Sequence, residues 1–174
     1  MQMTAELEES FNTQITLEFE ASMVYRQLAI EMEIRDLPGM AAWLRHQADE
    51  EIVHANKFID HLSDRDNHPS IGAIAAPALE ISTVLDCFEA ALKHEEGVSA
   101  AIRELYVTGD RAGDLDSRPL LTWFLSEQIE EESTVREIVG RIELIKDDGP
   151  GLLRLDDDMA TRPVATTENS SRPA

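Results

Sequence analysis

Residues 66–77 of the chain read DNHPSIGAIAAP, with two prolines, one glycine and no acid, lysine or arginine after Asp66. This composition predicts an irregular connection of about a dozen residues, which is long for a loop in a helical bundle. Extended at ~3.3 Å per residue, it reaches ~40 Å, which is also the length of a helix of ~27 residues. The connection can therefore run back along the whole of a neighbouring helix.

Two helices are predicted before this connection. Residues 4–34 contain no glycine or proline, which favours one long helix. Residues 36–39, DLPG, end it, and Pro38 suits the first turn of a second helix that runs to about Arg65. Because the turn between them is short, the two helices are expected to form an antiparallel hairpin.

A second hairpin is predicted after the connection. Its first helix runs from about Ala78 to Thr108 and stops at Gly109. The next helix starts at Ser117, a good N-cap, and ends near residues 148–150. Hairpin, crossover and hairpin define the predicted fold class, which is all-α: a four-helix bundle with one long crossover between its second and third helices.

The remaining segment is expected to add one short element. Residues 151–160 are compatible with a short fifth helix, so residues 1–160 are expected to form a single domain. Residues 161–174, TRPVATTENSSRPA, have the composition of a disordered tail.

Composition limits the partners of the protein. The 174 residues include 15 lysines and arginines against 35 acids, a formal net charge of −20. Such a surface repels nucleic acid and anionic lipid and attracts cations. The single cysteine, Cys87, excludes an internal disulfide and cysteine-rich metal sites, which fits a reducing compartment and hence a cytoplasmic location. The sequence has no signal-peptide pattern and no run of 18 apolar residues, so no membrane association is expected.

Each predicted helix carries apolar residues at alternating steps of three and four, the spacing of a seam that faces the inside of a bundle. Near its middle, each seam is interrupted by polar residues. These interruptions are the candidate site residues: Glu18, Glu51, His54, Glu95, Gln128 and Glu131.

The polar interruptions are predicted to lie at one level of the bundle. In an antiparallel hairpin, two residues at the same height have numbers whose mean falls in the turn. Glu18 and His54 have a mean of 36, within the first turn, and Glu95 and Glu131 have a mean of 113, within the second. In both hairpins, moreover, the first two interruptions are 33 residues apart. Each hairpin is therefore expected to supply half of one site.

Four glutamates buried in an apolar bundle would each cost several kcal/mol if they stayed ionised and unpaired, against a total stability of ~5–15 kcal/mol. No seam position offers lysine or arginine, so protons or metal ions must neutralise the glutamates. Two divalent cations balance four carboxylates. Carboxylates with one imidazole suit iron or manganese better than zinc, which favours nitrogen and sulfur ligands. The pattern therefore predicts a dinuclear metal site.

Other polar residues have a weaker connection to the seam. Three glutamates neighbour it: Glu50, Glu127 and Glu130. Spacing alone leaves solvated charge and metal binding equally open for these three. Tyr25 is expected to be a core residue, although it lies two turns from Glu18 and could act as a local electron donor. Gln47 and His61 are interpreted as polar residues at the ends of the bundle.

Four motifs in these helices resemble those of the ferritins, specifically the haem-free bacterial kind, over roughly residues 5–160. The motifs are LEFEASMVY (17–25), ADEEIVHA (48–55), KHEE (93–96) and WFLSEQIEEE (123–132). The resemblance implies a ferroxidase centre, which oxidises Fe(II) to Fe(III). Haem is not expected, because Ile52 follows the bridging glutamate where haem-binding relatives carry a methionine.

The resemblance also implies a role for each site residue. One iron ion would be held by Glu18, Glu51 and His54. The second would be held by Glu51, Glu95 and Glu131, with Gln128 beside it. A third iron position would lie nearby, at Glu50, Glu127 and Glu130.

Three functions are compatible with these residues. The resemblance implies an iron-storage protein, a homo-oligomeric cage of 24 subunits in which iron oxidised with dioxygen or peroxide accumulates as a ferric oxide mineral. A stand-alone di-iron or di-manganese oxidoreductase would instead act on peroxide or an organic substrate as a monomer or dimer. A structural bundle with a protonated acidic seam would bind no metal specifically.

Overall fold

Five helices form the main part of the chain. The structure, a computed structural model, describes residues 2–161. Its helices are α1 (Ala5–Ile34), α2 (Pro38–Asp64), α3 (Val84–Arg111), α4 (Arg118–Ile145) and α5 (Gly149–Ala160). Residues 2–161 contain no strand, so the predicted all-α class and the short fifth helix are confirmed. Of the tail predicted for residues 161–174, all but Thr161 lies outside the described residues.

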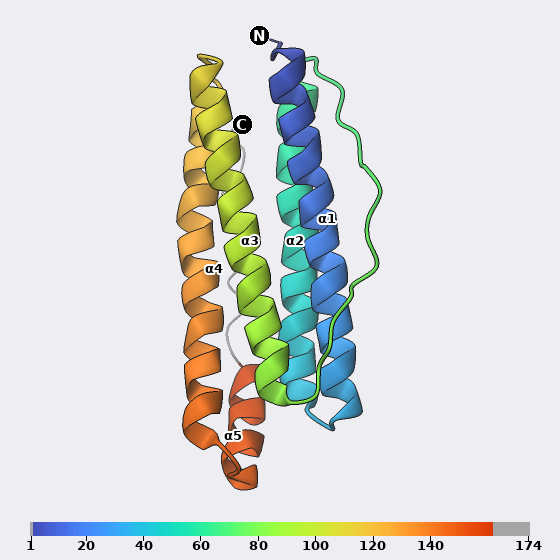
Figure 1. The fold of residues 1–174 in the computed structure, drawn as a ribbon, viewed down its shortest axis with the longest axis vertical. Helices are drawn as coiled ribbons and strands as arrows, with labels where there is room; N and C mark the ends of the chain where they lie inside the picture. The colour runs from blue at the N-terminus through green and yellow to red at the C-terminus, as the bar shows by residue number, and fades with distance from the viewer. Residues whose placement is uncertain (1, 162–174) are drawn as a thin grey trace.

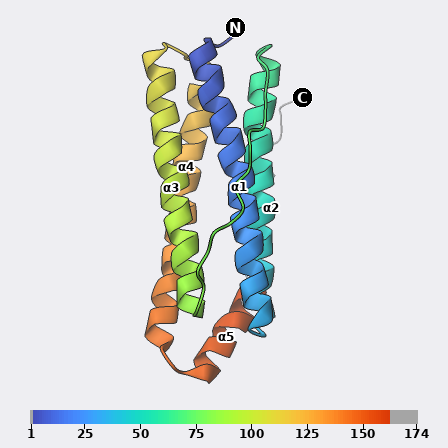
Figure 2. The ribbon, with the colours of Figure 1, turned by 45° about the vertical axis from the view of Figure 1, so that its right-hand side comes forward.

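The long helices are arranged as two antiparallel hairpins, α1 with α2 and α3 with α4 (Figure 1). The crossover from α2 to α3 runs along the length of the bundle, and Figure 2 shows the same course from a second angle. It is held to α1 by backbone amides of residues 70, 72 and 75, which donate to Asn12 Oδ1, Thr16 Oγ1 and Glu20 Oε1 at 2.8, 2.8 and 3.1 Å. These acceptors lie one turn apart, so the crossover follows one face of α1. The predicted topology is confirmed.

The crossover is longer than the sequence predicts. Helix α3 begins at Val84 instead of Ala78, so residues 65–83 make the connection. Thr83 Oγ1 accepts a hydrogen bond from the Asp86 amide, and the Asp86 carboxylate accepts one from the Thr83 amide. This reciprocal capping box fixes the start of the helix.

Two further predicted boundaries need correction. Helix α3 does not stop at Gly109 but continues to Arg111. The chain turns instead at Gly113, whose φ of 69° lies in the left-handed region that glycine adopts without strain. Helix α5 begins at Gly149 rather than at residue 151.

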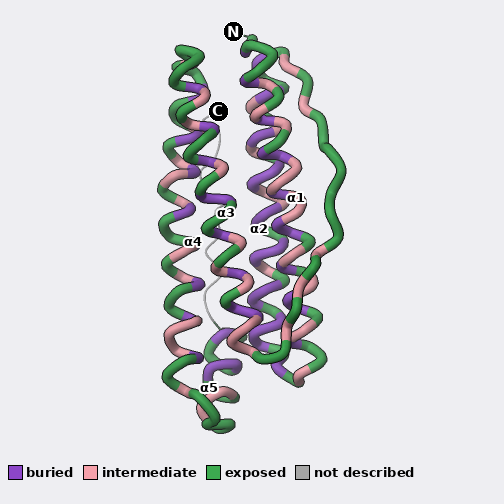
Figure 3. Tube along the Cα trace, in the orientation of Figure 1, coloured by how far each residue is buried: buried purple, intermediate pink, exposed green. Residues whose placement is uncertain are grey.

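The core consists of two apolar clusters on either side of a layer of buried polar side chains. This polar layer contains Glu18, Glu51, His54, Glu95, Gln128 and Glu131. The cluster nearer α5 includes Tyr25 and the residues of α4 from Val135 onward. The other includes Ile15, Phe58 and Phe124, and the rings of the last two stack with their centroids 4.1 Å apart. Figure 3 shows the buried positions as inward-facing stripes along each long helix. The polar layer therefore lies inside the bundle, closed off by hydrocarbon above and below.

A buried carboxylate joins α5 to the start of α2. Asp156 is buried, and its two oxygens accept the backbone amides of Gly39 and Met40 at 3.1 and 2.7 Å. The N-cap residue of α2, Leu37, offers no side-chain hydrogen bond, so Asp156 supplies the cap from outside the helix. A Cβ atom on Gly39 would lie 2.0 Å from the Asp156 carbonyl oxygen, so the two backbones are in direct contact.

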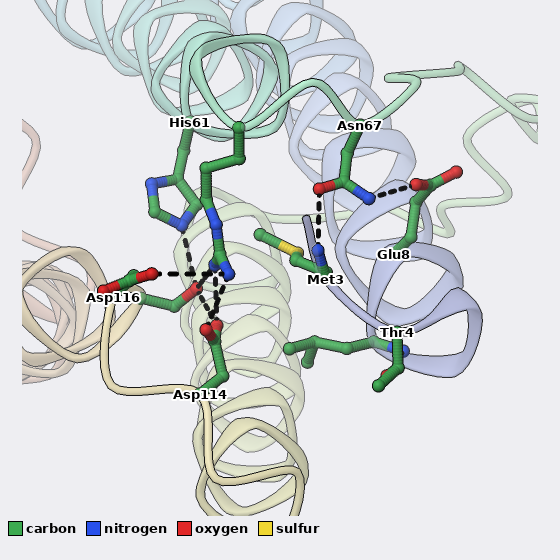
Figure 4. Close-up of polar contacts among 10 residues, drawn as sticks. Met3, Thr4, Glu8, His61, Asn67, Asp114 and Asp116 are labelled. Carbon is green, nitrogen blue, oxygen red and sulfur yellow. Dashed lines mark hydrogen bonds and ion pairs between the residues drawn. The ribbon is translucent and has the colours of Figure 1, made fainter. Parts of the chain in front are cut away.

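A buried ion pair closes the other end of the bundle (Figure 4). Both terminal nitrogens of Arg65 donate to the carboxylate of Asp114 at 2.7 Å, and Arg65 also donates to Ser117 Oγ at 2.8 Å. His61 Nε2 lies 2.8 Å from the same hydroxyl. Ser117 does precede α4, but its side chain makes no capping hydrogen bond. The expected capping role of Ser117 is therefore wrong, because its hydroxyl joins this network instead.

No helix among residues 2–161 combines the length and the apolar character needed to cross a lipid bilayer.

The Arg65–Asp114 pair leads to a stability prediction. Asp114→Asn removes the nearer acid of a largely buried guanidinium and leaves Asp116, 3.8 Å away, which is exposed, so we expect the free energy of unfolding to fall by about 2 kcal/mol or more. Asp110→Asn is the matched control, because the Asp110–Arg118 pair is about half exposed and should contribute less than about 1 kcal/mol. Equal losses for both variants in urea denaturation would contradict the assigned role of the buried pair.

Candidate metal centre

The six predicted site residues all lie in the polar layer, on four different helices. Each is between 1% and 8% exposed. Helix α1 contributes Glu18, α2 contributes Glu51 and His54, α3 contributes Glu95, and α4 contributes Gln128 and Glu131. The pairs on α2 and α4 are three residues apart, which places both members of each pair on one helical face.

One half of the layer can hold a metal ion. The carboxylate and imidazole atoms of Glu18, Glu51 and His54 all lie within 4.8 Å of one another. His54 Nδ1 is 3.3 Å from Glu51 Oε2. Glu18 Oε2 and His54 Nε2 are buried and make no hydrogen bond within residues 2–161. Buried polar atoms without a partner are rare in folded proteins, and oxygen and imidazole nitrogen are donors that iron and manganese accept. The residues therefore fit a divalent cation.

The other half of the layer is organised around Glu95. The Tyr25 hydroxyl donates to Glu95 Oε1 at 2.5 Å, and Gln128 Nε2 donates to Glu95 Oε2 at 3.1 Å. Glu131 Oε2 accepts a hydrogen bond from Gln47 Nε2 at 3.1 Å. Both carboxylates are thus held in place by neutral donors, and neither is matched by a positive charge in these contacts.

Electrostatics link the carboxylates of the two halves. Burial raises the pKa of Glu18 well above its usual value, and the charge of Glu51 raises it further. Burial and the charge of Glu95 do the same for the pKa of Glu51. Burial, followed by the charges of Glu95 and Glu51, raises the pKa of Glu131. These acids retain protons at a pH where exposed glutamates have lost theirs, and a cation can take the place of those protons.

The three neighbouring glutamates differ in their surroundings. Glu50 is 7% exposed, and its Oε1 lies 3.5 Å from His46 Nε2. Glu127 is partly buried, and burial raises its pKa, with Glu130 and Glu50 among the charges that raise it further. Glu130 is exposed. Glu50 and Glu127 therefore adjoin the polar layer, whereas Glu130 lies at its outer edge.

Two glutamines contact the site that the seam pattern did not assign to it. Gln14 donates to Glu18 Oε1 at 2.8 Å, and Gln47 donates to Glu131 Oε2. The interpretation of Gln47 as a bundle-end residue is therefore wrong. The sequence did carry a signal, because Gln14 and Gln47 each precede a site glutamate, Glu18 or Glu51, by four residues. The two glutamines thus repeat the 33-residue spacing of those glutamates.

Fold and site together define a four-helix bundle with a buried centre of carboxylates and one histidine. A family model for the ferritin-like domain matches residues 8–145. Bacterial non-heme ferritins of Escherichia coli O6:H1 and Staphylococcus saprophyticus are 32% and 31% identical to the chain. The alignments cover 90% and 95% of this chain and 94% and 99% of those relatives.

Solved structures agree with this assignment. The open-pore ferritin of the hyperthermophilic archaeon Archaeoglobus fulgidus is 31% identical, with a TM-score of 0.90 over 93% of this chain and 99% of that chain. An engineered closed form of the Archaeoglobus fulgidus ferritin has the same TM-score over 92% and 98% of the two chains. The chain belongs to the ferritin family, which confirms the resemblance seen in its motifs.

The raised pKa values lead to a pH prediction for the metal-free protein. Unfolded glutamates titrate near 4.5, whereas in the folded chain Glu18, Glu51 and Glu131 titrate higher. Above pH 4.5 the unfolded state therefore releases protons that the folded state retains, and the free energy of unfolding falls as pH rises. We expect the thermal midpoint of the metal-free protein to decrease from pH 5 to pH 8.

Two variants separate this effect from general charge repulsion. Glu131→Gln removes one buried acid and should flatten the pH dependence. Glu96→Gln removes one exposed acid and should leave the slope as in the wild type. A thermal midpoint that rises over this pH range, or equal slopes in the two variants, would contradict the buried acidic centre.

Proposed function

We propose that the protein is an iron-storage ferritin that oxidises Fe(II) at the buried centre and stores the product as a ferric mineral inside a multi-subunit cage. One observation carries the proposal: ligand atoms of Glu18, Glu51 and His54 lie within 4.8 Å of one another in the buried layer, and Glu18 Oε2 makes no hydrogen bond within residues 2–161. Membership of the ferritin family supports it, as do relatives named bacterial non-heme ferritin over more than nine-tenths of their length.

Iron is the substrate of the proposed centre. Glu18, Glu51 and His54 would bind one Fe(II), and Glu51, Glu95 and Glu131 the second, so that Glu51 bridges the two. Gln128 would orient Glu95 through the hydrogen bond that it already donates. Tyr25, hydrogen-bonded to Glu95, stands where it can supply an electron locally.

Pairing the two ions determines the chemistry. Each Fe(II) gives up one electron, so two ions together reduce dioxygen to hydrogen peroxide, or peroxide to water, without releasing a one-electron oxygen radical. Carboxylate ligands favour the harder and more highly charged Fe(III) product. The role of the protein is to hold both ions at the fixed positions that its four helices define.

Acidic residues around the centre would guide iron to it. Glu50 and Glu127 adjoin the centre, and with Glu130 at its edge they would form the third iron position. A formal charge of −20 per chain creates a negative potential that draws Fe(II) inward. Haem has no place in this proposal, since Ile52 is not a haem ligand. The cytoplasmic location inferred from the single cysteine stays a prediction.

The main alternative is a stand-alone di-iron or di-manganese oxidoreductase of peroxide or an organic substrate. Size separates the two functions, because a cage of 24 subunits is far larger than a monomer or dimer. Size-exclusion chromatography of the purified protein, followed by an iron stain after incubation with Fe(II) in air, should show a large assembly that stains for iron. A monomer or dimer that retains only a few ions per chain would favour the alternative.

Glu51 is the decisive residue for the proposed reaction. We expect Glu51→Ala to abolish rapid Fe(II) oxidation, because it removes the shared bridge, while the chain still folds and assembles, because a buried acid is lost. Oxygen uptake after addition of Fe(II) measures the rate, and size-exclusion chromatography measures assembly. The control is Glu96→Ala, which removes an exposed glutamate next to Glu95 and should oxidise iron at the wild-type rate. Unchanged initial oxygen uptake in Glu51→Ala would overturn the assignment.

A further inference from the structure

The two oxygens of Glu18 have different surroundings. Gln14 Nε2 donates to Oε1 at 2.8 Å, and both side chains are buried, at 2% and 1% exposure. Oε2 is buried and makes no hydrogen bond within residues 2–161.

The Gln14 hydrogen bond restrains the orientation of the Glu18 carboxylate. A hydrogen bond to an ionised acceptor is about twice as strong as one between neutral groups. Rotation of the carboxylate to turn both oxygens toward a metal ion would break this bond and leave the Gln14 amide buried without an acceptor, at a cost of ~1–3 kcal/mol. Gln14 lies between Phe11 and Ile15 in the sequence. Both of these residues belong to the apolar cluster that contains Phe58 and Phe124.

Glu95 differs from Glu18 in this respect. Both Glu95 oxygens already accept hydrogen bonds, one from Tyr25 and one from Gln128. In Glu18, by contrast, Oε1 accepts a hydrogen bond and Oε2 accepts none within residues 2–161. The difference comes from a single side chain, because Gln14 is the only donor that the structure gives to Glu18 within residues 2–161.

We propose that Gln14 is a positioning residue that keeps Oε1 of Glu18 for its own amide and presents Oε2 alone to the first metal ion. Single-oxygen binding by Glu18 leaves that ion one ligand short, which keeps a position open for the oxidant. This inference deepens the proposed function and rests on it.

The space around Gln14 determines which substitution tests the proposal. Gln14 also lines a groove of about 250 Å³ between α1 and α3, together with Ser10, Thr13 and Glu104. A small side chain at position 14 would connect this groove to the metal centre and admit water. Gln14→Met keeps the approximate length of the side chain and removes the amide, and with it the donor to Glu18. Gln14→Leu carries the same test if the methionine variant does not fold.

The experiment uses Co(II) as an anaerobic, redox-stable probe of the assembled protein. We expect Gln14→Met to bind Co(II) with unchanged stoichiometry but about tenfold more weakly, as is common when a partner of a metal ligand is removed. The visible Co(II) band should also weaken, because a Glu18 carboxylate that is free to bind through both oxygens raises the coordination number. Calorimetry measures the affinity, and absorption spectroscopy measures the band.

Gln27 provides the matched control. It lies on the same helix and donates to Glu31 four residues later at 3.3 Å, away from the site. Gln27→Met should therefore change neither the affinity for Co(II) nor its spectrum. A general weakening of α1 would affect both variants alike, whereas a positioning effect appears only at residue 14.

Each remaining outcome is decisive. A Co(II) spectrum in Gln14→Met identical to that of the wild type would overturn the single-oxygen role, whether or not the affinity falls. A changed spectrum with retained affinity would support it. Wild-type protein that binds no Co(II) tightly would overturn the proposed function itself, and this inference with it, which distinguishes the two failures.

Discussion

The structure depends on one constraint: acidic side chains must be buried at mid-height in a bundle whose interior is otherwise hydrocarbon. Glu18, Glu51, Glu95 and Glu131 lie between two apolar clusters that exclude water. Burial and neighbouring charges raise the pKa values of Glu18, Glu51 and Glu131, and a divalent cation can neutralise the same carboxylates in place of protons. The centre is thus an unfavourable arrangement in the metal-free chain that becomes favourable when cations bind, which couples stability to the proposed activity.

The sequence predicted the fold and the six central side chains because both follow from periodicity. A seam with steps of three and four places its residues inside the bundle, and turn positions determine which of them share a height. Contacts between side chains on different helices do not follow from this periodicity. Whether Gln47 reaches Glu131 on another helix depends on rotamers and on the distance between helices, which no single-helix pattern encodes. For the same reason the sequence did not predict the contact of Ser117. Its hydroxyl, expected to cap α4, accepts a hydrogen bond from Arg65 at the end of α2.

Element boundaries failed where two local signals competed. Gly109 marks a helix end when it is read alone, yet α3 buries it and continues to Arg111, because Gly113 provides the left-handed turn. The start of α3 is fixed by the Thr83–Asp86 capping box and not at the predicted Ala78. In both cases a specific backbone hydrogen bond or φ angle prevailed over residue composition.

The contact between α5 and α2 ties the last helix to the helix that carries Glu51 and His54. Asp156 completes the first turn of α2, three turns before Glu50 and Glu51. The close approach at Gly39 leaves no room for a side chain, so the backbones of the two helices touch at this point. Loss of α5 would leave the first turn of α2 without its cap, on the helix that carries Glu51 and His54. Deleting or redesigning α5 would therefore not be neutral, because its effect would reach Glu51 along α2, across about 15–20 Å of helix.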